Sequence, residues 1–373
     1  MTEKYTALYE EHKKLGASFT DFGGWQMPLK YSSELAEHHA VRKAAGLFDL
    51  SHMGEVWVTG PDAAAFLDYA LVGKLSAIAD GKAKYSLICN EDGGIIDDLI
   101  TYRFGDEKYL VVPNAGNAPT VAAALAERAG NFDVKVENVS AEMSLVAVQG
   151  PKAEAILLKL TAEPQHALVT GLKYYAFNEV TVAGHEVILA RTGYTGEDGF
   201  ELFVPNDGAA PLWASIAEAG AEFGIVPCGL ASRDSLRLEA GMPLYGNELS
   251  LEGDPFAAGL GPVVALSKEG DFVGKAALAA TKAAGAGTTT GRRLVGLKGL
   301  GRRAGRGHYP VLKDGVVVGE VTSGQPSPTL GYPVAMAYVD VALTGPGTAL
   351  DIDLRGKAEP FEVVALPFYK RHK

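Results

Sequence analysis

A run of small residues from Ala277 to Gly291 divides the sequence into two parts of different character. The run, ALAATKAAGAGTTTG, begins with a helical composition and ends in Gly and Thr, which give a segment little to pack with. It predicts a linker between a region over 1–276 and another over 292–373. In the second region short strand-like runs alternate with turns, as in KDGVVVGEVTSG and ALDIDL, and this spacing predicts a small antiparallel barrel or sandwich.

The region before the linker mixes helix-like and strand-like stretches. PDAAAFLDYAL and TVAAALAERAG are typical of helices, whereas EVWVTG, KYLVVP and EVTVAG are typical of strands. The sequence has neither a TIM-type βα repetition nor a GxGxxG motif after a strand. We therefore expect an α+β fold and no built-in nicotinamide or flavin Rossmann domain.

Composition and charge exclude some classes of function. The chain has 373 residues, 47% hydrophobic and 21% charged, which is enough for two or three packed domains. The N-terminal stretch MTEKYTALYEEHKKLG is charged and lacks an apolar signal core, and no run approaches the ~20 apolar residues that cross a bilayer, so we expect a cytoplasmic protein. A formal net charge of -11 argues against general nucleic-acid binding.

The two cysteines, Cys89 and Cys228, lie in apolar surroundings. Neither has a partner at the spacing of a metal or redox site. We expect both to be buried structural thiols, and we expect no metal requirement.

A basic cluster follows the linker, against the acidic balance of the chain. Its members are Arg292, Arg293, Lys298, Arg302, Arg303, Arg306 and His308. Such a cluster could meet an acidic protein or a polyanionic small molecule. A solvated loop whose charges pair with scattered carboxylates is an equally open interpretation.

The stretch YSLICNEDGGIIDDLITYRF predicts a β-hairpin that places a carboxylate on an apolar face. Glu91–Gly94 would make the turn, and the residues after it would alternate between two faces. Asp98 then shares a face with apolar and aromatic neighbours such as Tyr102, and Asp97 would be the solvated member of the pair. A carboxylate on an apolar face costs free energy unless it is paired or neutralised, so Asp98 is a functional candidate. A turn cap or a pair with a lysine is the plainer alternative.

The stretch EVILARTGYTGEDGFELFV predicts a long hairpin whose centre is too rich in Gly and Thr for a regular element. In its second strand Phe200, Leu202 and Val204 would face one way and Glu201 the other. A glutamate that offers two oxygens to a planar, amidine-like edge can recognise a ring. An exposed strand carboxylate is the plainer alternative.

The stretch GLASRDSLRLEAG predicts a helix with Arg233 and Arg237 at positions i and i+4. Two guanidinium groups this close repel each other unless acids lie between them. Asp234 and Glu239 could supply those acids, and so could a ligand that bears carboxylates.

Seven ordered motifs run through the chain nearly from end to end. They are DFGGWQMP, FDLSHMGE, YSLICNEDGGIIDDLITY, RTGYTGEDGFEL, GLASRDSLRLEAGMPLYGNE, DFVGK and TSGQPSPTLG. In this order they resemble the T proteins, the aminomethyltransferases of the glycine cleavage system. The resemblance implies a three-lobed α+β fold with a central folate site, two interleaved lobes before the linker and a C-terminal β-barrel-like domain.

The resemblance also implies a reaction. In that family the aminomethyl group on the dihydrolipoyl arm of the lipoylated H protein passes to tetrahydrofolate, which gives 5,10-methylene-tetrahydrofolate and ammonia. The implied partners are the H protein and tetrahydrofolate as co-substrate, without a metal, nucleic acid or membrane.

Carried over residue by residue, the resemblance makes Asp98 the catalytic aspartate. A partly desolvated carboxylate there could hold the folate amine, move a proton and stabilise an iminium-like carbon. Glu201 matches the position that binds the pterin ring, and Arg233 the position near the folate tail. The other residues expected to line the pocket are Met53, Tyr85, Tyr102, Asn114, Tyr194 and Tyr369. Met242 stands where some relatives carry tyrosine.

Three alternative functions stay open. Folate-dependent demethylases of small methylated compounds share the fold, although Asp98 in its IIDDL context and the lack of a fused oxidase domain favour glycine cleavage. Relatives that support iron–sulfur protein maturation carry a KGCYxGQ-type segment, where this chain has RTGYTGEDGFE. A binding protein without chemistry would leave the carboxylate on an apolar face unexplained.

Overall fold

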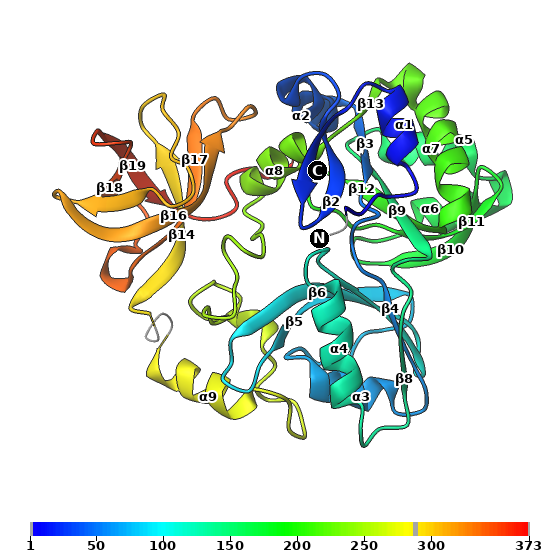
Figure 1. Ribbon diagram of the computed structural model, residues 1–373, viewed down its shortest axis with the longest axis horizontal. Coiled ribbons are helices and arrows are strands. Elements are labelled where there is room, and N and C mark those ends of the chain that lie inside the picture. The colour runs from blue at the N-terminus through cyan, green and yellow to red at the C-terminus, as the bar shows by residue number, and fades with distance from the viewer. Residues whose placement is uncertain (1–2, 286–289, 372–373) are drawn as a thin grey trace. The chain divides into compact units, whose positions relative to one another are not determined.

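The chain forms two compact units, each assembled from separate segments (Figure 1). The first unit comprises Met1–Phe66, Leu75–Lys84 and Leu99–Asp234, and the second comprises Leu67–Lys74, Tyr85–Asp98 and Ser235–Lys373. The structure, a computed structural model, describes residues 3–285 and 290–371. Within these ranges no helix combines the length and apolar character needed to span a bilayer.

A six-stranded sheet with helices on one face forms the core of the first unit. The strands, in sheet order, are β10 (Phe177–Val182), β11 (His185–Ala190), β12 (Gly199–Pro205), β9 (Met143–Gln149), β3 (Ala45–Asp49) and β13 (Ile225–Pro227). Neighbours pair antiparallel except β13 with β3. Helices α5 (Ala153–Leu160) and α7 (Asn206–Gly220) cover one face, as Figure 1 shows. That face buries Phe200, Leu202 and Val204, as their alternation predicts.

A second sheet has five strands. In sheet order they are β5 (Lys82–Cys89), β6 (Ile95–Gly105), β7 (Lys108–Pro113), β4 (Val56–Thr59) and β8 (Lys135–Asn138). Strands β5 and β6 each run from one unit into the other, because the boundaries fall at Lys84 and Asp98.

The remaining elements before the linker are short helices and one hairpin. They are α1 (Tyr9–Lys14), β1 (Ser18–Phe22), β2 (Trp25–Lys30), α2 (Glu34–Lys43), α3 (Ala63–Ala70), α4 (Ala118–Arg128), η1 (Glu163–Gln165), α6 (His166–Thr170), η2 (Ala221–Phe223), α8 (Leu230–Glu239), η3 (Gly261–Val263) and α9 (Lys275–Ala284). Helix α9 takes up the first part of the expected linker. Residues 286–289 of it lie outside the described ranges, so the linker stays a prediction.

A closed six-stranded barrel follows in the second unit. Around the barrel the strands are β14 (Arg292–Gly299), β17 (Pro333–Asp340), β16 (Val316–Pro326), β15 (Pro310–Lys313), β18 (Ala349–Asp353) and β19 (Ala358–Val364), with η4 (Val341–Leu343) after β17. Alternate residues such as Leu297, Val321 and Ile352 fill its interior. The structure thus confirms the α+β class and selects the barrel over the sandwich.

Candidate active site

The β5–β6 hairpin carries Asp98 as the sequence predicts, but it reverses the expected exposure of the aspartate pair. The turn is closed by the Asn90 side chain, whose Oδ1 accepts a 2.7 Å hydrogen bond from the Gly94 N–H. Asp98 is half-buried, whereas Asp97 is fully buried. The expectation that Asp97 is solvated is therefore wrong.

The cause of this reversal is the segment after α8. The Tyr245 hydroxyl donates a 3.0 Å hydrogen bond to the backbone carbonyl of Ile95. The side chain of Ile95 lies on the same side of β6 as that of Asp97. Ile95 also packs in an apolar cluster with Leu249 and Phe256. Burial, followed by the nearby charge of Asp97, raises the pKa of Tyr245 to about 12. Over residues 95–99 this side of β6 is thus the covered side, and the side that carries Asp98 is the more open one.

Within the second unit, Asp98 has an aromatic hydrogen-bond partner. The Tyr85 hydroxyl on β5 donates a 2.9 Å bond to Asp98 Oδ2. The third predicted residue of this unit, Tyr369, is half-buried, and its N–H donates a 2.8 Å bond to the carbonyl of Glu239 at the end of α8. The structure therefore joins Tyr85 to Asp98 and fixes the backbone of Tyr369 against α8.

In the first unit, Glu201 and Tyr102 meet through a residue that the sequence did not single out. The Thr192 hydroxyl donates to Glu201 Oε2, and its oxygen lies 3.3 Å from the Tyr102 hydroxyl. Tyr102 is 1% exposed, Thr192 1% and Glu201 8%. Glu201 faces away from the helix-covered core, as the alternation in β12 predicts.

Burial sets the acidity of this group. It raises the pKa of Glu201 above its ordinary value, although the Thr192 hydrogen bond and the Arg233 charge oppose the rise. Burial also raises the pKa of Tyr102 well above its ordinary value, and the negative charge of Glu201 adds to the effect. Tyr174 and Tyr175 contribute further to that rise, so they are neighbours of the Tyr102 hydroxyl that the sequence did not indicate.

Arg233 lies over the ring of Tyr194, with its guanidinium carbon 4.7 Å from the ring centroid. This is a cation–π geometry, which holds the guanidinium without neutralising it. The first turn of α8 is fixed by the buried Glu37, whose Oε2 accepts a 2.9 Å bond from the Gly229 N–H. Burial and the Arg233 charge also lower the pKa of His52 to about 4. The His52 imidazole near Arg233 is therefore neutral at pH 7.

Arg237 has a structural partner. Its Nη1 lies 3.0 Å from Glu248 Oε2, and both side chains are almost fully buried. The sequence offered Asp234, Glu239 or a ligand as the neutralising acid, and Glu248 was not among them. Glu239 itself accepts bonds from Ser327 and Thr329.

Met53 and Asn114 lie on adjacent loops of the first unit. The N–H of Gly54 donates a 3.1 Å bond to the carbonyl of Pro113, which places the two loops side by side. Both predicted residues are half-buried.

Gln149, at the end of β9, is a further buried residue that the sequence did not indicate. Its Nε2 donates to the Thr192 carbonyl at 3.1 Å, and its Oε1 accepts from the Thr195 hydroxyl at 2.8 Å. A Cβ on Gly193 would lie 2.0 Å from Oε1, and one on Gly199 would lie 2.5 Å from Nε2. Gly193 and Gly199 of the TGYTGEDG segment are thus needed for close packing against Gln149.

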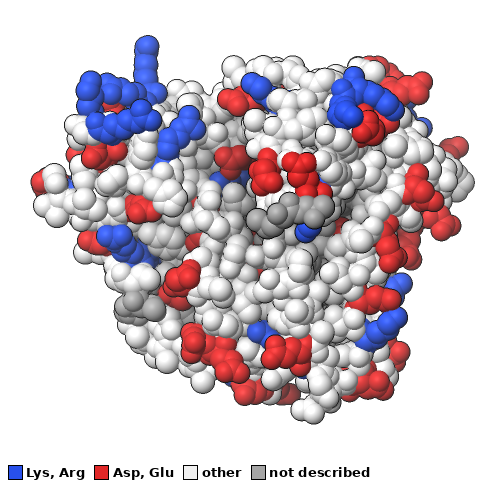
Figure 2. All heavy atoms as spheres, viewed as in Figure 1, with Lys and Arg blue, Asp and Glu red and all other residues white. Residues whose placement is uncertain are grey.

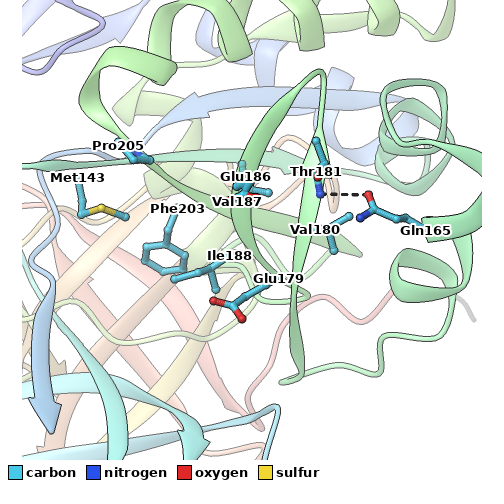
Figure 3. A pocket seen from close by; sticks show the side chains of 10 residues that line it. All are labelled: Met143, Gln165, Glu179, Val180, Thr181, Glu186, Val187, Ile188, Phe203 and Pro205. Atoms are coloured by element: carbon cyan, nitrogen blue, oxygen red, sulfur yellow. Dashed lines mark hydrogen bonds between the residues drawn. The ribbon is translucent and has the colours of Figure 1, made fainter.

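A separate cleft of about 410 Å³ lies on the six-stranded sheet (Figure 3). Its lining includes Phe203, which shares a face of β12 with Glu201. Its lining residues are Met143, Gln165, Glu179, Val180, Thr181, Glu186, Val187, Ile188, Phe203 and Pro205. The lining contains none of the residues predicted for the folate site.

The basic cluster after the linker is partly neutralised. Ion pairs join Arg292 to Asp340, Lys298 to Glu362, Arg303 to Glu359 and His308 to Glu320. Arg302 and Arg306 are exposed and form no ion pair with any residue in the described ranges. Figure 2 shows Lys and Arg side chains gathered over the barrel. The four ion pairs agree with the interpretation as a solvated loop, and the interpretation as a binding surface stays a prediction.

Both cysteines are buried, as predicted, and neither forms a disulfide.

The units define a class of protein, an α+β region followed by a small antiparallel barrel. Residues 8–268 match the family described as the GCVT N-terminal domain, and residues 292–370 match the glycine cleavage T-protein C-terminal barrel domain. The chain belongs to the glycine cleavage T-protein family. This confirms the resemblance drawn from the seven motifs.

Relatives named aminomethyltransferase match over the full length. The protein from Streptomyces avermitilis is 59% identical over 99% of this chain and 98% of its own, and that from Bacillus subtilis is 45% identical over 99% of each. The crystal structure of the glycine cleavage system aminomethyltransferase T from Bartonella henselae has a TM-score of 0.91 and 37% identity, with 99% of both chains covered. The predicted enzyme class, a folate-dependent aminomethyltransferase, is confirmed at the level of the family.

Proposed function

We propose that this chain transfers the one-carbon unit of aminomethyl-dihydrolipoyl H protein to tetrahydrofolate. In that reaction the C–N bond to the leaving amine and the C–S bond to the lipoyl arm break, and two C–N bonds to the folate form. Two protons leave the folate nitrogens, and one each ends on ammonia and on the thiol. The reaction therefore needs a group that can hold protons and positive charge beside the carbon.

The observation that carries the proposal is the half-buried Asp98 carboxylate held by Tyr85. A half-buried carboxylate can accept hydrogen bonds from a cationic or N–H-bearing substrate. We assign Asp98 the task of holding the folate amine, moving its proton and stabilising the iminium-like carbon. Strand β6 carries both Asp98 and Tyr102, which share one face of the strand.

For the folate itself, we assign Glu201 to the pterin ring and Arg233 to the carboxylate tail. A buried carboxylate has lost hydrogen bonds from water. It therefore favours a ring edge whose N–H groups donate hydrogen bonds in their place. The Arg233 guanidinium, which lies over the Tyr194 ring, can donate charge-assisted hydrogen bonds to the glutamate portion of the ligand. Met53, Tyr102, Asn114, Tyr194, Tyr85 and Tyr369 complete the proposed folate-binding set.

We further propose that the exposed part of the basic cluster helps to dock the H protein, which we take to be acidic. Arg302 and Arg306 are the members that support this, because they are exposed on the loop between β14 and β15. Charges of this kind accelerate encounter more than they strengthen the final complex. We propose the cytoplasm as the site of action, on the likeness of the chain to bacterial aminomethyltransferases.

The test is ammonia release from aminomethylated H protein by the purified chain, with and without tetrahydrofolate. Strong acceleration by tetrahydrofolate, with 5,10-methylene-tetrahydrofolate as product, is the expected result. If folate binds and no ammonia is released, the aminomethyl transfer is refuted. Small methylated amines are then the next substrates to assay, as expected of a folate-dependent demethylase.

A further inference from the structure

The hydroxyl of Thr192 stands between the two side chains that the folate proposal uses most in the first unit. It contacts Glu201 Oε2 on one side and the Tyr102 hydroxyl on the other. All three groups are buried, so water does not compete freely for these bonds. Thr192 itself lies in the segment between β11 and β12.

Proton counting fixes the direction of this relay. A threonine hydroxyl has one proton, and the proton goes to Glu201 when that group is a carboxylate, because a charged acceptor makes the stronger bond. The Tyr102 hydroxyl must then donate to the Thr192 oxygen. The Tyr102 hydroxyl therefore donates to Thr192, and the Thr192 hydroxyl donates to Glu201. Both O–H dipoles are oriented toward the carboxylate.

The backbone of Thr192 is held independently of the ligand. Gln149 donates to its carbonyl, accepts from Thr195, and also lies 3.4 Å from the carbonyl of Phe200 on β12. Gly193 and Gly199 let the chain close around the Gln149 amide. Thr192 and the strand of Glu201 are thus fastened to the same side chain, which preorganises their contact.

The charged and titratable groups around Glu201 come from three other elements. Arg233 on α8 and the Thr192 hydroxyl favour its charged form, and burial opposes it. Tyr102 on β6 faces it, with Tyr174 and Tyr175 from the segment before β10 close to Tyr102. The adjacent strands contribute Ala190 from β11 and Ala147 from β9 opposite Glu201, and neither can ionise. Thr192 and Arg233 are therefore the groups that can keep Glu201 ionised.

We infer that Thr192 is a positioning residue which, oriented by Tyr102, holds Glu201 as a charged hydrogen-bond acceptor and so selects ring edges that present N–H donors. The inference rests on the proposed function, because it takes the pterin ring as the partner of Glu201. A neutral Glu201 would present a donor of its own, and a donor facing N–H groups repels them. Selectivity for a 2-amino-4-oxo ring would then fall together with affinity.

The experiment is calorimetric binding of 5-formyl-tetrahydrofolate, a folate that cannot accept the one-carbon unit, from pH 5.5 to 9. The wild-type chain is compared with Thr192→Val, which replaces the hydroxyl by a methyl group of similar size, and with Thr192→Ser, which keeps the hydroxyl. We expect Thr192→Val to raise the Kd at pH 7 on the order of tenfold, and to begin losing affinity at a higher pH than wild type as pH falls. Thr192→Ser should restore both properties to within about threefold of wild type.

Two further variants test whether Thr192 affects folate binding through Glu201. In a Glu201→Gln background, Thr192→Val should change the Kd little, because no carboxylate remains to be held. Tyr102→Phe should also raise the Kd, by a smaller factor than Thr192→Val does. It reports on the relay even where the valine variant does not fold.

The outcomes separate this inference from the proposed function. Wild-type binding with an unchanged pH profile in Thr192→Val overturns the inference alone. Normal binding and the expected shift, without aminomethyl transfer by wild type, overturn the transfer and leave the inference standing. Absence of folate binding by wild type at every pH overturns both.

Discussion

The Tyr85 hydroxyl on β5 donates a 2.9 Å hydrogen bond to Oδ2 of Asp98 on the adjacent strand β6. Because the two strands are neighbours in one sheet, the carboxylate is oriented before any substrate arrives. Asp98→Asn keeps the shape and removes the charge. We expect it to bind folate within about threefold of wild type and to lose on the order of 10²–10⁴-fold in turnover.

The measurement for Asp98→Asn is ammonia release at saturating folate, beside calorimetric folate binding. Tyr85→Phe is the companion variant. It leaves Asp98 charged and removes one donor, so its turnover should fall by only about tenfold. Near-normal turnover of Asp98→Asn would remove Asp98 from the catalytic role.

A second prediction concerns Glu201, the buried acceptor on β12. Glu201→Gln replaces one carboxylate oxygen by a donor, and a hydrogen bond to a charged group is worth about 1.5–3 kcal/mol. We expect the folate Kd to rise roughly 10- to 150-fold, with turnover at saturating folate changed less. The matched control is Glu179→Gln, an exposed glutamate in the cleft on the same sheet. Equal folate affinity of Glu201→Gln and wild type would refute the assignment.

Alternation along a strand was enough to predict the faces of Asp98 and Glu201. It could not predict which face solvent reaches. Asp97 is buried because the segment that contains Tyr245, about 150 residues later in the sequence, covers that side of β6. Periodicity reports on neighbours within a strand, whereas coverage depends on tertiary contacts.

The same limit explains why Thr192 and Gln149 were missed. The segment TGYTGEDG, which begins at Thr192, was recognised from its sequence as a Gly- and Thr-rich loop. The role of Thr192 depends on Gln149, which lies 43 residues away and has no distinctive sequence pattern around it. Likewise the helix with Arg233 and Arg237 was correctly predicted, while the acid that pairs with Arg237 lies beyond the helix, at Glu248. Local sequence therefore gives the elements and the candidate side chains, and the long-range partners require the fold.

The basic cluster gives a prediction about ionic strength. Arg302→Ser with Arg306→Ser removes two exposed charges that lack ion-pair partners among the described residues. We expect the KM for the H protein to rise several-fold at low salt and to converge on wild type near 0.5 M salt, where the Debye length is only about 4 Å. Lys135→Ser with Lys152→Ser makes the same charge change on the first unit and serves as control. If the wild-type KM for the H protein does not change with salt concentration, docking by this cluster is refuted.

His52 predicts loss of stability in mild acid. Its pKa falls from 6.5 to about 4 in the folded chain, because it is buried and near Arg233. Between these values the unfolded chain binds the proton and the folded chain does not, so stability is complete above pH 6.5 and declines as the pH falls toward 4. From pH 7.5 to 5 the contribution of His52 to stability falls by roughly 2 kcal/mol.

The measurement is the urea midpoint at the two pH values, followed by tryptophan fluorescence. The three tryptophans all lie in the first unit, as His52 does, so the signal reports the relevant part of the chain. His52→Gln cannot titrate in this range, and its midpoint should fall less than that of wild type. The carboxylate of Asp49 does not confuse the comparison. Burial would raise its pKa, but His12, Thr6 and the Ser51 N–H hold it below 3.8, so it stays ionised at pH 5.

The last prediction concerns Gly193, whose missing side chain makes room for the Gln149 amide. A Cβ there would lie 2.0 Å from Gln149 Oε1, and the amide cannot retreat because it is hydrogen-bonded at both ends and blocked by Gly199. We expect Gly193→Ala to destabilise the first unit by about 1–3 kcal/mol. It should also weaken folate binding, because Thr192 moves with Gln149. Gly105→Ala, where no atom lies within 4 Å of the new Cβ, should do neither. If Gly193→Ala matches Gly105→Ala in urea midpoint and folate Kd, Gln149 does not hold the loop that carries Thr192.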